Sequence, residues 1–402
     1  MSARVIRSTV RGFLHLDSHP DGCARVVEDL WTRVPAAPAG TGTGSRRVAL
    51  IIGSSAGYGL AATVAAMARY GIACVGVCFE KAATERRTAT AGWYRVAAAA
   101  KLAEKAGTEV AFINADAFAD DTKAAVLELI ANRFGRLDYL VYSIAAPRRT
   151  DPETGTTYTS VIKPIGATHR TRTLVFDADG QADCKEIEIA PAEGDDVAQT
   201  VNVMGGTDWV RWIDALITRD LLAPGFATVA LSYIGSELTG PIYRQGTIGA
   251  AKAHLEETAR ILTGRVHDHC GGFAATSVNG AAVTQSSTAI PGIALYLGLL
   301  RGVLGTGMRS PIEQFVDLWD QLTGTTPLDL DDLGRIRLDS WELSADVQAA
   351  VAARWADASN DTIADLADID WFRTEVRRLY GLSVPGVDYE QPTEMDQAWP
   401  TA

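Results

Sequence analysis

Lysine is scarce in this chain, and net positive charge is absent. The 402 residues include 37 lysines and arginines, of which only seven are lysine, against 49 aspartates and glutamates. The net charge of -12 and the pI near 5.0 exclude the basic surface that attracts nucleic acids and anionic membranes, so we expect neither as a partner. Lys252 is the only lysine after Lys185, and its presence needs its own explanation.

Long apolar runs are also missing. The most apolar stretch, AIPGIALYLGLL, stops at Arg301 and is too short to span a bilayer, so we expect a buried helix there. The first twenty residues, MSARVIRSTVRGFLHLDSHP, contain basic residues but no apolar run, so we expect no signal peptide. Stable membrane insertion is therefore not expected.

The cysteines and histidines lack the spacings of disulfide frameworks and metal sites. The five cysteines are odd in number and include no Cys-x-x-Cys pair, which favours free thiols in a reducing compartment. The one dense cluster, HDHC from His267 to Cys270, places adjacent ligands on one short segment, where they rarely converge on one ion. We expect no metal site and a cytoplasmic location.

Apolar runs of strand length alternate with helix-like segments along most of the chain. The run VALII (Val48 to Ile52) precedes a glycine-rich loop, an alanine-rich stretch and a second apolar run that ends at Phe79-Glu80. The pattern recurs in TEVAFINADAF, LDYLVYSIAAP, FATVALSYIG and FAATSVNG. Strands buried on both faces and alternating with helices predict an α/β fold with a doubly wound, Rossmann-like parallel sheet.

Three segments depart from this alternation. Residues 1–45 form an N-terminal extension that runs into a glycine-rich linker, AAPAGTGTGSRR. From about 148 to 198, TTYTSVIKPIG, TRTLVFDADG and CKEIEIAP predict short strands with Asp-Gly and Pro-Ile-Gly turns, hence a β-rich insertion. Residues 306–402 look mainly helical, with Trp341, Trp355 and Trp371 as expected core anchors. We expect one elaborated domain over 1–402, with its core in 46–305.

The loop after the first strand is rich in glycine: Gly53-Ser54-Ser55-Ala56-Gly57-Tyr58-Gly59. A tight turn followed by a helix N-terminus suits a pyrophosphate. Glu80, at the end of the second strand, can accept hydrogen bonds from both adenosine ribose hydroxyls and would repel a 2′-phosphate, so we expect NADH over NADPH. A solvated strand end is the alternative for Glu80. Asp116-Ala117 and Ile144-Ala145 end the third and fourth strands, where the adenine and the nicotinamide ribose should lie.

Tyr243 and Lys252 are nine residues apart, and none of the eleven tyrosines has a lysine four residues later, as short-chain dehydrogenases do. On one continuous helix, nine residues at about 100° each would place the two side chains on opposite faces. Gly246 interrupts the segment, and Thr247 is the expected N-cap of a helix that begins near Ile248. Tyr243 then precedes the helix, Lys252 lies in its second turn, and both can reach one cofactor.

This region resembles a known family. The segment SYIGSELTGPIYRQGTIGAAK is similar to the Tyr-x8-Lys signature of the large enoyl-acyl-carrier-protein reductases, also known as trans-2-enoyl-CoA reductases. Further segments are similar in the same order and cover nearly the whole chain, which argues against chance. They are RGFLHLDSHPDGC, GSSAGYGLA, FE, TAGWY, INADAF, KPIG, VMGGTDWVRWIDAL, VTQSSTAIP, RLDSWEL and PGVDY.

The resemblance implies NADH-dependent reduction of the trans-2 double bond of a fatty acyl thioester, carried by acyl carrier protein or CoA, by a monomer. Tyr243 and Lys252 would form the catalytic pair, with Lys252 also binding the cofactor, and Tyr233 would contact the substrate. The ammonium would favour a developing phenolate and hold the ribose hydroxyls. The positions that match the family's NAD contacts are Gly53 to Tyr58, Phe79-Glu80, Asp116-Ala117, Ile144-Ala145 and the Ala282-Val283-Thr284 turn.

Two positions depart from the family pattern. Many members carry a lysine two residues before the equivalent of Lys252, where this chain has Ala250, and another in the SVNG stretch, where Gly280 stands. Both changes remove positive charge near the expected cofactor and thioester. Two other functions stay open. One is carbonyl reduction of a 3-oxoacyl thioester, against which the missing Tyr-x3-Lys pair argues. The other is a non-catalytic NAD-binding scaffold, against which the retained Tyr243 and Lys252 argue.

Overall fold

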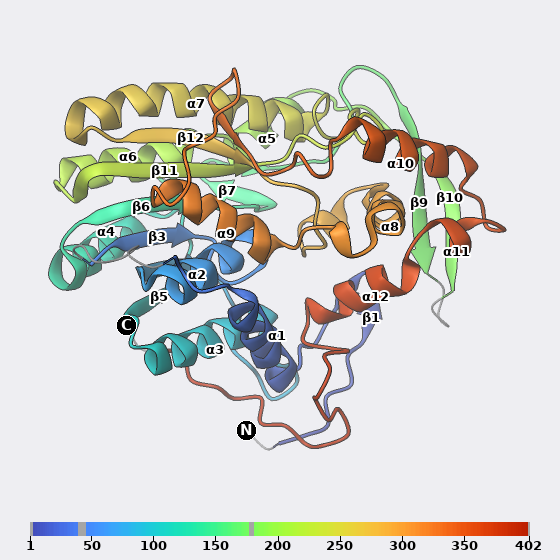
Figure 1. The fold of residues 1–402 in the computed structure, drawn as a ribbon, viewed down its shortest axis with the longest axis horizontal. Helices are drawn as coiled ribbons and strands as arrows, with labels where there is room; N and C mark the ends of the chain where they lie inside the picture. The colour runs from blue at the N-terminus through green and yellow to red at the C-terminus, as the bar shows by residue number, and fades with distance from the viewer. Residues whose placement is uncertain (1–2, 39–45, 177–180, 401–402) are drawn as a thin grey trace.

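A seven-stranded parallel sheet forms the centre of the protein in a computed structural model that describes residues 3–38, 46–176 and 181–400 (Figure 1). Every neighbouring pair in the sheet is parallel. The predicted α/β fold with a doubly wound sheet is therefore confirmed. The strand order is β13 (Arg335–Arg337), β12 (Phe273–Val278), β11 (Leu222–Ser232), β6 (Leu137–Tyr142), β3 (Val48–Ile52), β4 (Ala73–Cys78) and β5 (Val110–Asn114).

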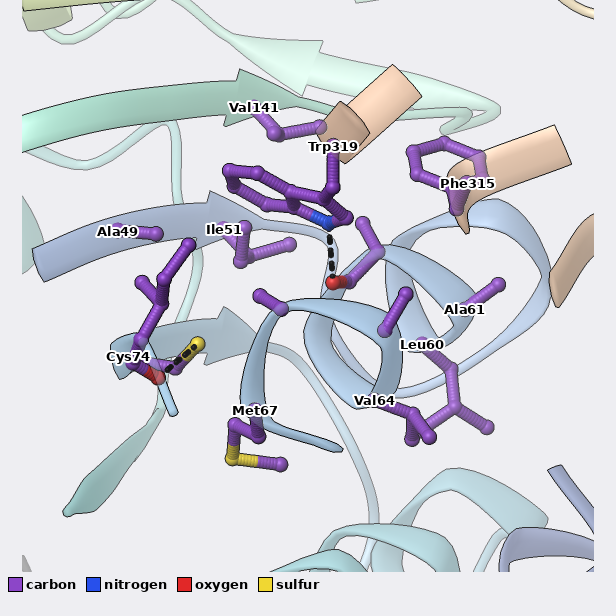
Figure 2. Packing of buried hydrophobic residues seen from close by; sticks show 14 of the residues in the cluster. Ala49, Ile51, Leu60, Ala61, Val64, Met67, Cys74, Val141, Phe315 and Trp319 are labelled. Atoms are coloured by element: carbon purple, nitrogen blue, oxygen red, sulfur yellow. Dashed lines mark hydrogen bonds between the residues drawn. The ribbon is translucent and has the colours of Figure 1, made fainter. Parts of the chain in front are cut away.

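Helices cover both faces of the sheet. On one face lie α2 (Gly57–Tyr70), α3 (Ala91–Ala106) and α9 (Pro311–Leu322), and on the other lie α4 (Asp120–Leu129), α6 (Thr207–Thr218) and α7 (Thr247–Cys270). A π-helical turn, Ile130–Phe134, continues α4. The small alanine side chains of α2 let this helix pack closely on β3. Trp319 of α9 packs on α2 from the other helix and donates from Nε1 to the Ala62 carbonyl at 2.8 Å (Figure 2).

The predicted β-rich insertion is present as two antiparallel pairs followed by a helix. These are β7 (Arg148–Thr150) with β8 (Thr157–Thr159), β9 (His169–Phe176) with β10 (Ala182–Ile189), and α5 (Asp196–Met204). The expected Asp-Gly turn between β9 and β10 falls on 177–180, and most of the expected glycine-rich linker on 39–45, outside the described residues.

The terminal segments pack beside the sheet. The N-terminal part contains β1 (Val10–Arg11), β2 (Leu14–His15) and α1 (Pro20–Arg33). The C-terminal part contains α8 (Ile293–Leu304), α10 (Ala345–Asp357), α11 (Ile363–Leu366) and α12 (Ile369–Arg378), with short 3-10 turns at Ser287–Ala289 and Gly305–Gly307. A first apolar core lies between the sheet and α2, α3 and α9, and a second lies between the sheet and α4, α6 and α7. α8 is buried, as its apolar sequence predicts, and forms a third core with the C-terminal helices.

The three tryptophans that were expected to anchor the core lie at its margin and not inside it. Trp341, Trp355 and Trp371 are only partly buried and pack against the margin of the third core. The fully buried tryptophans are Trp209, Trp212 and Trp319, which lie between the helices and the sheet.

No helix in the described part of the chain is both long enough and apolar enough to cross a membrane. All five cysteines are free thiols, and three of them are buried: Cys23, Cys74 and Cys78.

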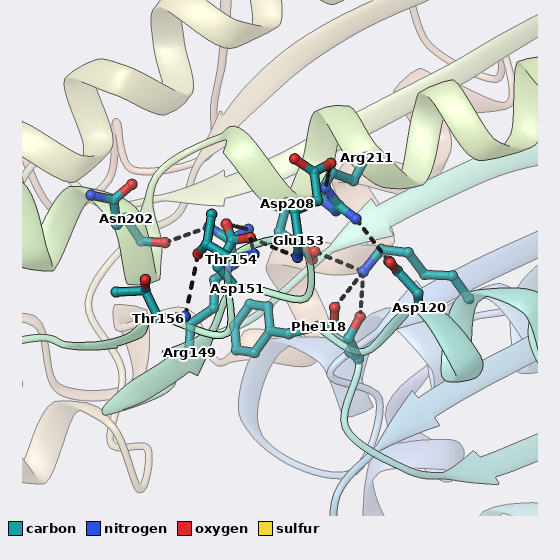
Figure 3. Close-up of polar contacts among 12 residues, drawn as sticks. Phe118, Asp120, Arg149, Asp151, Glu153, Thr154, Thr156, Asn202, Asp208 and Arg211 are labelled. Carbon is teal, nitrogen blue, oxygen red and sulfur yellow. Dashed lines mark hydrogen bonds and ion pairs between the residues drawn. The ribbon is translucent and has the colours of Figure 1, made fainter.

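Two arginines tie the insertion to the helices beside it. Arg149 of β7 is almost fully buried and donates to the Asn202 carbonyl of α5 at 2.9 Å and to Asp151 at 3.2 Å. Arg211 of α6 pairs with Asp120 of α4 at 2.8 Å and with Glu153 of the insertion (Figure 3). The Arg211 contacts therefore hold the insertion against α6 and α4.

A buried ion pair links this region to the loop that follows β5. The Lys123 Nζ donates to Asp208 Oδ1 at 2.8 Å and to the carbonyls of Ala117 and Phe118 at 2.9 and 3.0 Å (Figure 3). Both side chains are nearly inaccessible, at 5% and 1% exposure. Burial lowers the pKa of Lys123 and raises that of Asp208, and the opposite charge of each partner counteracts the shift. Lys123 thereby fixes two carbonyls of the loop that was predicted to bind the adenine.

We expect Lys123→Met to destabilise the protein by about 3–5 kcal/mol, because it leaves the Asp208 carboxylate buried without its cation. Urea unfolding of the two proteins measures the difference. Lys101→Met, on the exposed surface of α3, is the matched control and should stay within about 0.5 kcal/mol of wild type. Equal stability of the two variants would contradict a stabilising role for the pair.

Candidate active site

The carboxyl ends of β3, β4, β5 and β6 meet at one edge of the sheet, where the strand order reverses between β3 and β6. Gly53 leaves β3 there with a φ of +89°, and a Cβ on it would lie 2.1 Å from the Ser143 carbonyl oxygen, so no other residue fits. Its amide donates to the Val77 carbonyl at 2.8 Å. The glycine loop is thus held against the strands on both sides.

The helix α2 begins directly after this loop. Its N-cap is Ala56, whose side chain caps no backbone amide, so the amides of the first turn remain available to an anion. Ser54 is fully buried below the loop, and its amide donates to the Val77 carbonyl at 3.1 Å. The structure therefore gives Gly53 to Tyr58 the backbone arrangement that a pyrophosphate needs.

Glu80 is oriented by two hydroxyls. Its Oε1 accepts from Ser55 Oγ at 2.6 Å, and its Oε2 accepts from Thr90 Oγ1. Asn114 of β5 accepts from the Glu80 amide at 2.7 Å and fixes the backbone. The neighbouring Phe79 exposes 77% of its surface, which is rare for a ring this size. Glu80 is therefore an ordered carboxylate beside the glycine loop, which supports cofactor binding over a solvated strand end. Thr90 was missed by the sequence analysis.

The other predicted strand-end residues lie along the same edge. Asp116 Oδ1 accepts from the Phe118 amide at 2.9 Å, and the Ala117 carbonyl accepts from Lys123. Ile144 and Ala117 pack partly against the second core, whereas Ala145 is exposed. Their backbones line the edge where a dinucleotide would lie.

The Ala282-Val283-Thr284 turn follows β12 and lies over the glycine loop. A Cβ on Gly57 would be 3.4 Å from the Thr284 Cγ2, so the two predicted segments are in contact. The Tyr58 hydroxyl reaches across and donates to the Gly280 carbonyl. The structure brings together these two halves of the predicted cofactor site.

Gly280, one of the two departures from the family pattern, lies directly against the indole of Trp341. A Cβ there would lie 2.4 Å from Cζ2 of Trp341, so the indole occupies the space of any side chain at this position. Gln314 accepts from the Gly280 amide at 2.8 Å. A lysine at 280 would require Trp341 to move.

Tyr243 lies in the turn between β11 and α7 and is 6% exposed. Its ring meets that of Tyr233 edge-to-face, with centroids 4.6 Å apart and an angle of 70°. Within the described residues the Tyr243 hydroxyl has no hydrogen-bond partner, whereas Tyr233 donates to Glu342 Oε1 at 2.8 Å. Tyr243 therefore has the uncommitted phenol of the pair.

Burial and the charge of Glu342 raise the pKa of Tyr243 well above its ordinary value. The expectation that the Lys252 ammonium favours a developing phenolate stays a prediction, since burial and the charge of Glu342 are the causes that act on Tyr243 here. Lys252 lies in the second turn of α7, and its Nζ donates to the Leu231 carbonyl of β11 at 2.9 Å. Burial lowers the pKa of Lys252 to about 8, opposed by the charge of Glu256. A phenol held protonated is suited to donating a hydrogen bond.

The start of α7 differs from the prediction by one residue. Gly246 is the N-cap, and Thr247 is the first helical residue, so it cannot serve as N-cap. Its hydroxyl instead donates to the Val161 carbonyl at 2.5 Å and accepts from the Lys163 amide at 3.2 Å. The KPIG segment of the insertion is therefore fastened to the point where the chain passes from Tyr243 into α7.

Glu342 is the functional candidate that sequence reasoning missed. It lies in RLDSWEL, after β13, and is fully buried. Its carboxylate accepts from the hydroxyls of Tyr233 and Tyr296, at 2.8 and 2.7 Å, and from the Ala281 amide at 2.5 Å. No periodicity marks such a residue; only its place beside Trp341 in a segment similar to the family could have drawn attention to it.

His267 and His269 of the HDHC segment lie in the last turn of α7. In the part of the chain that the structure describes, no group of three or more histidine, cysteine, aspartate or glutamate side chains is arranged to hold a metal ion.

Family models match most of the chain in three consecutive parts. The catalytic region of trans-2-enoyl-CoA reductase matches residues 87–323, and the NAD(P)H binding domain of trans-2-enoyl-CoA reductase matches residues 5–85. A model described as an enoyl reductase FAD binding domain matches residues 330–393.

The segment that matches this third model packs against the rest of the chain. Its apolar residues Val351, Phe372 and Val376 are buried in the third core. Its buried Asp339 carboxylate pairs with the Arg337 guanidinium at 2.8 and 2.9 Å.

Relatives are similar over their full lengths. The enoyl-[acyl-carrier-protein] reductase [NADH] of Streptomyces avermitilis is 57% identical over 98% of this chain and 100% of its own. A Clostridium trans-2-enoyl-CoA reductase solved with NADH has a TM-score of 0.90 and 33% identity, covering 98% of each chain. That of Treponema denticola, solved with NAD, has a TM-score of 0.89 and 38% identity, covering 97% of this chain and 98% of that one. The chain belongs to the trans-2-enoyl-CoA reductase family of NADH-dependent enoyl thioester reductases.

Proposed function

We propose that this protein reduces the trans-2 double bond of an enoyl thioester with NADH, with Tyr243 as the group that acts on the thioester oxygen. The observation that carries the assignment of Tyr243 is its buried phenol in the turn between β11 and α7, whose hydroxyl has no hydrogen-bond partner among the residues that the structure describes. The neighbouring phenol of Tyr233 is committed to Glu342, so its ring, more than its hydroxyl, faces the substrate.

The residues present fit a bound dinucleotide and the chemistry it supplies. When bound, NADH provides a hydride for the β-carbon of the enoyl thioester. Negative charge then gathers on the thioester oxygen, and a hydrogen bond from Tyr243 stabilises it, a role worth about 2.7–4 kcal/mol per donor. Because the pKa of Tyr243 is raised, the phenol carries its proton when the substrate binds and can donate the hydrogen bond. The α-carbon takes its proton from Tyr243 or from a water that Tyr243 holds.

Lys252 has the second role in this proposal. Its ammonium is partly buried at the end of β11, where it can hold the ribose hydroxyls of the nicotinamide half. A compact ammonium suits this confined place better than the wide guanidinium that the chain uses elsewhere. The Ala282-Val283-Thr284 turn would line the nicotinamide, and Glu80 would bind the adenosine ribose.

Further parts of the proposal concern organisation. The segments that match the family models contribute strands to one sheet: residues 5–85 contribute β3 and β4, and residues 330–393 contribute β13. This shared sheet supports a single elaborated domain. The five free thiols support a cytoplasmic location. We propose a monomer that accepts acyl carrier protein or CoA thioesters, and the relative rates with the two carriers of one acyl chain would rank them.

The central prediction is that Tyr243→Phe lowers kcat with crotonyl-CoA by about 10²–10³, because the mutant loses one donor to the thioester oxygen. Absorbance at 340 nm with NADH measures the rate, and NADH binding should stay intact. Tyr158→Phe, in the β8 strand of the insertion, is the matched control and should keep wild-type turnover. Tyr243→Phe activity within twofold of wild type would remove Tyr243 from the chemistry.

A second prediction concerns the choice of cofactor. Glu80→Gln removes the charge but keeps the shape between Ser55 and Thr90, so kcat/KM with NADH should fall about 10–100-fold. The ratio of NADH to NADPH efficiency should fall with it, because the repulsion of a 2′-phosphate is lost. Steady-state kinetics with both cofactors give the ratio. An unchanged ratio would show that Glu80 does not select the cofactor.

A further inference from the structure

Glu342 joins three parts of the fold that otherwise meet only around the site. Tyr233 comes from the loop after β11, Tyr296 from α8, and the Ala281 amide from the turn after β12. Gln348 of α10 braces the assembly by donating to the Tyr296 hydroxyl oxygen at 3.1 Å and to the Glu342 carbonyl at 2.9 Å. Such a satisfied network in a buried place holds each member in one orientation.

We propose that Glu342 is a positioning residue of the reductase. In its ionised form it accepts hydrogen bonds from the hydroxyls of Tyr233 and Tyr296, which leaves Tyr243 as the phenol that donates to the thioester. This inference rests on the proposed role of Tyr243. An ionised carboxylate only accepts hydrogen bonds, so both phenols must point their protons at it. The Ala281 amide, one residue before the Ala282-Val283-Thr284 turn, is fixed by the same group.

Protonation of Glu342 would reverse one of these bonds. A protonated carboxyl must donate its proton, and the oxygens within reach are those of Tyr233 and Tyr296. The tyrosine that receives this proton can no longer donate to Glu342. If that tyrosine is Tyr233, its own proton turns into the site and competes with Tyr243 for the thioester oxygen.

The surroundings place this change near neutral pH. Burial raises the pKa of Glu342 to about 7, although the Ala281 amide and the hydroxyls of Tyr296 and Tyr233 lower it. Glu342 is thus ionised above about pH 7 and protonated below it, so activity should fall as the pH drops through that value. The titratable groups around it are Tyr233, Tyr296, Tyr243, Tyr58 and Asp339, the last of which adds to the raised pKa.

The test compares wild type with Glu342→Gln in turnover of crotonyl-CoA and NADH between pH 5.5 and about 9. Wild-type kcat/KM should fall on the acid side with an apparent pKa near 7. In Glu342→Gln this acid limb should be missing. The kcat at pH 8 should be about tenfold lower, because the amide NH2 that replaces Oε2 cannot accept from the Ala281 amide, and the uncharged Oε1 accepts more weakly from the two phenols. Tyr296→Phe should shift the limb to higher pH, since Glu342 loses a donor that lowers its pKa. This second variant serves if Glu342→Gln does not fold.

Glu375→Gln is the matched control, because burial also raises the pKa of this carboxyl while it lies on α12 among Arg378, Arg33 and Arg301. Its acid limb should equal that of wild type. Infrared difference spectra give a readout besides turnover: a protonated carboxyl band that titrates near pH 7 and is missing from Glu342→Gln. An acid limb or a carboxyl band unchanged in Glu342→Gln overturns the proposal. Absence of wild-type turnover, by contrast, would count against the proposed function, and the infrared band would still decide on Glu342.

Discussion

The backbone of a buried parallel sheet constrains everything else in this protein. Its strands are covered on both faces, so their polar groups must pair with one another, and all their carboxyl ends emerge at the same edge. The chain must turn sharply there, which is why Gly53 adopts a φ of +89° against the Ser143 carbonyl. Loops from distant parts of the sequence meet at that edge because the sheet leaves them no other place.

Burial at this edge then sets the chemistry of the side chains. Tyr243 and Glu342 are buried and Lys252 is partly buried, and for each of them this loss of solvent shifts the pKa toward the neutral form. For Tyr243 the shift is toward a firmly held proton, reinforced by the charge of Glu342. An uncharged donor in a dry site is a strong stabiliser of a developing oxyanion, because its hydrogen bond competes with little solvent. The same burial that builds the core thus prepares Tyr243 for the role proposed for it.

Local patterns in the sequence predict the sheet well, and the residues predicted to bind the cofactor lie along its carboxyl edge. The run Val48 to Ile52, the glycine loop and Glu80 depend on neighbours within one βαβ unit, and such local features leave a readable pattern. Glu342 leaves none, because its partners Tyr233 and Tyr296 come from other elements and meet it only in the folded chain. The partial exposure of Trp341 escaped prediction for a similar reason: composition marks a tryptophan as core, but topology decides how deep it lies.

Gly280 and Trp341 show how a departure from a family pattern acquires meaning only in three dimensions. In sequence, Gly280 looks like the loss of a positive charge near the thioester. In the structure, the Trp341 indole fills the space that a side chain at 280 would need, with Cζ2 only 2.4 Å from the place that a Cβ would take. The indole donates to the Leu338 carbonyl at 2.9 Å and stands one residue before Glu342. The glycine at 280 therefore leaves room for a rigid aromatic ring beside the carboxylate network, and packing of this ring orders the site here.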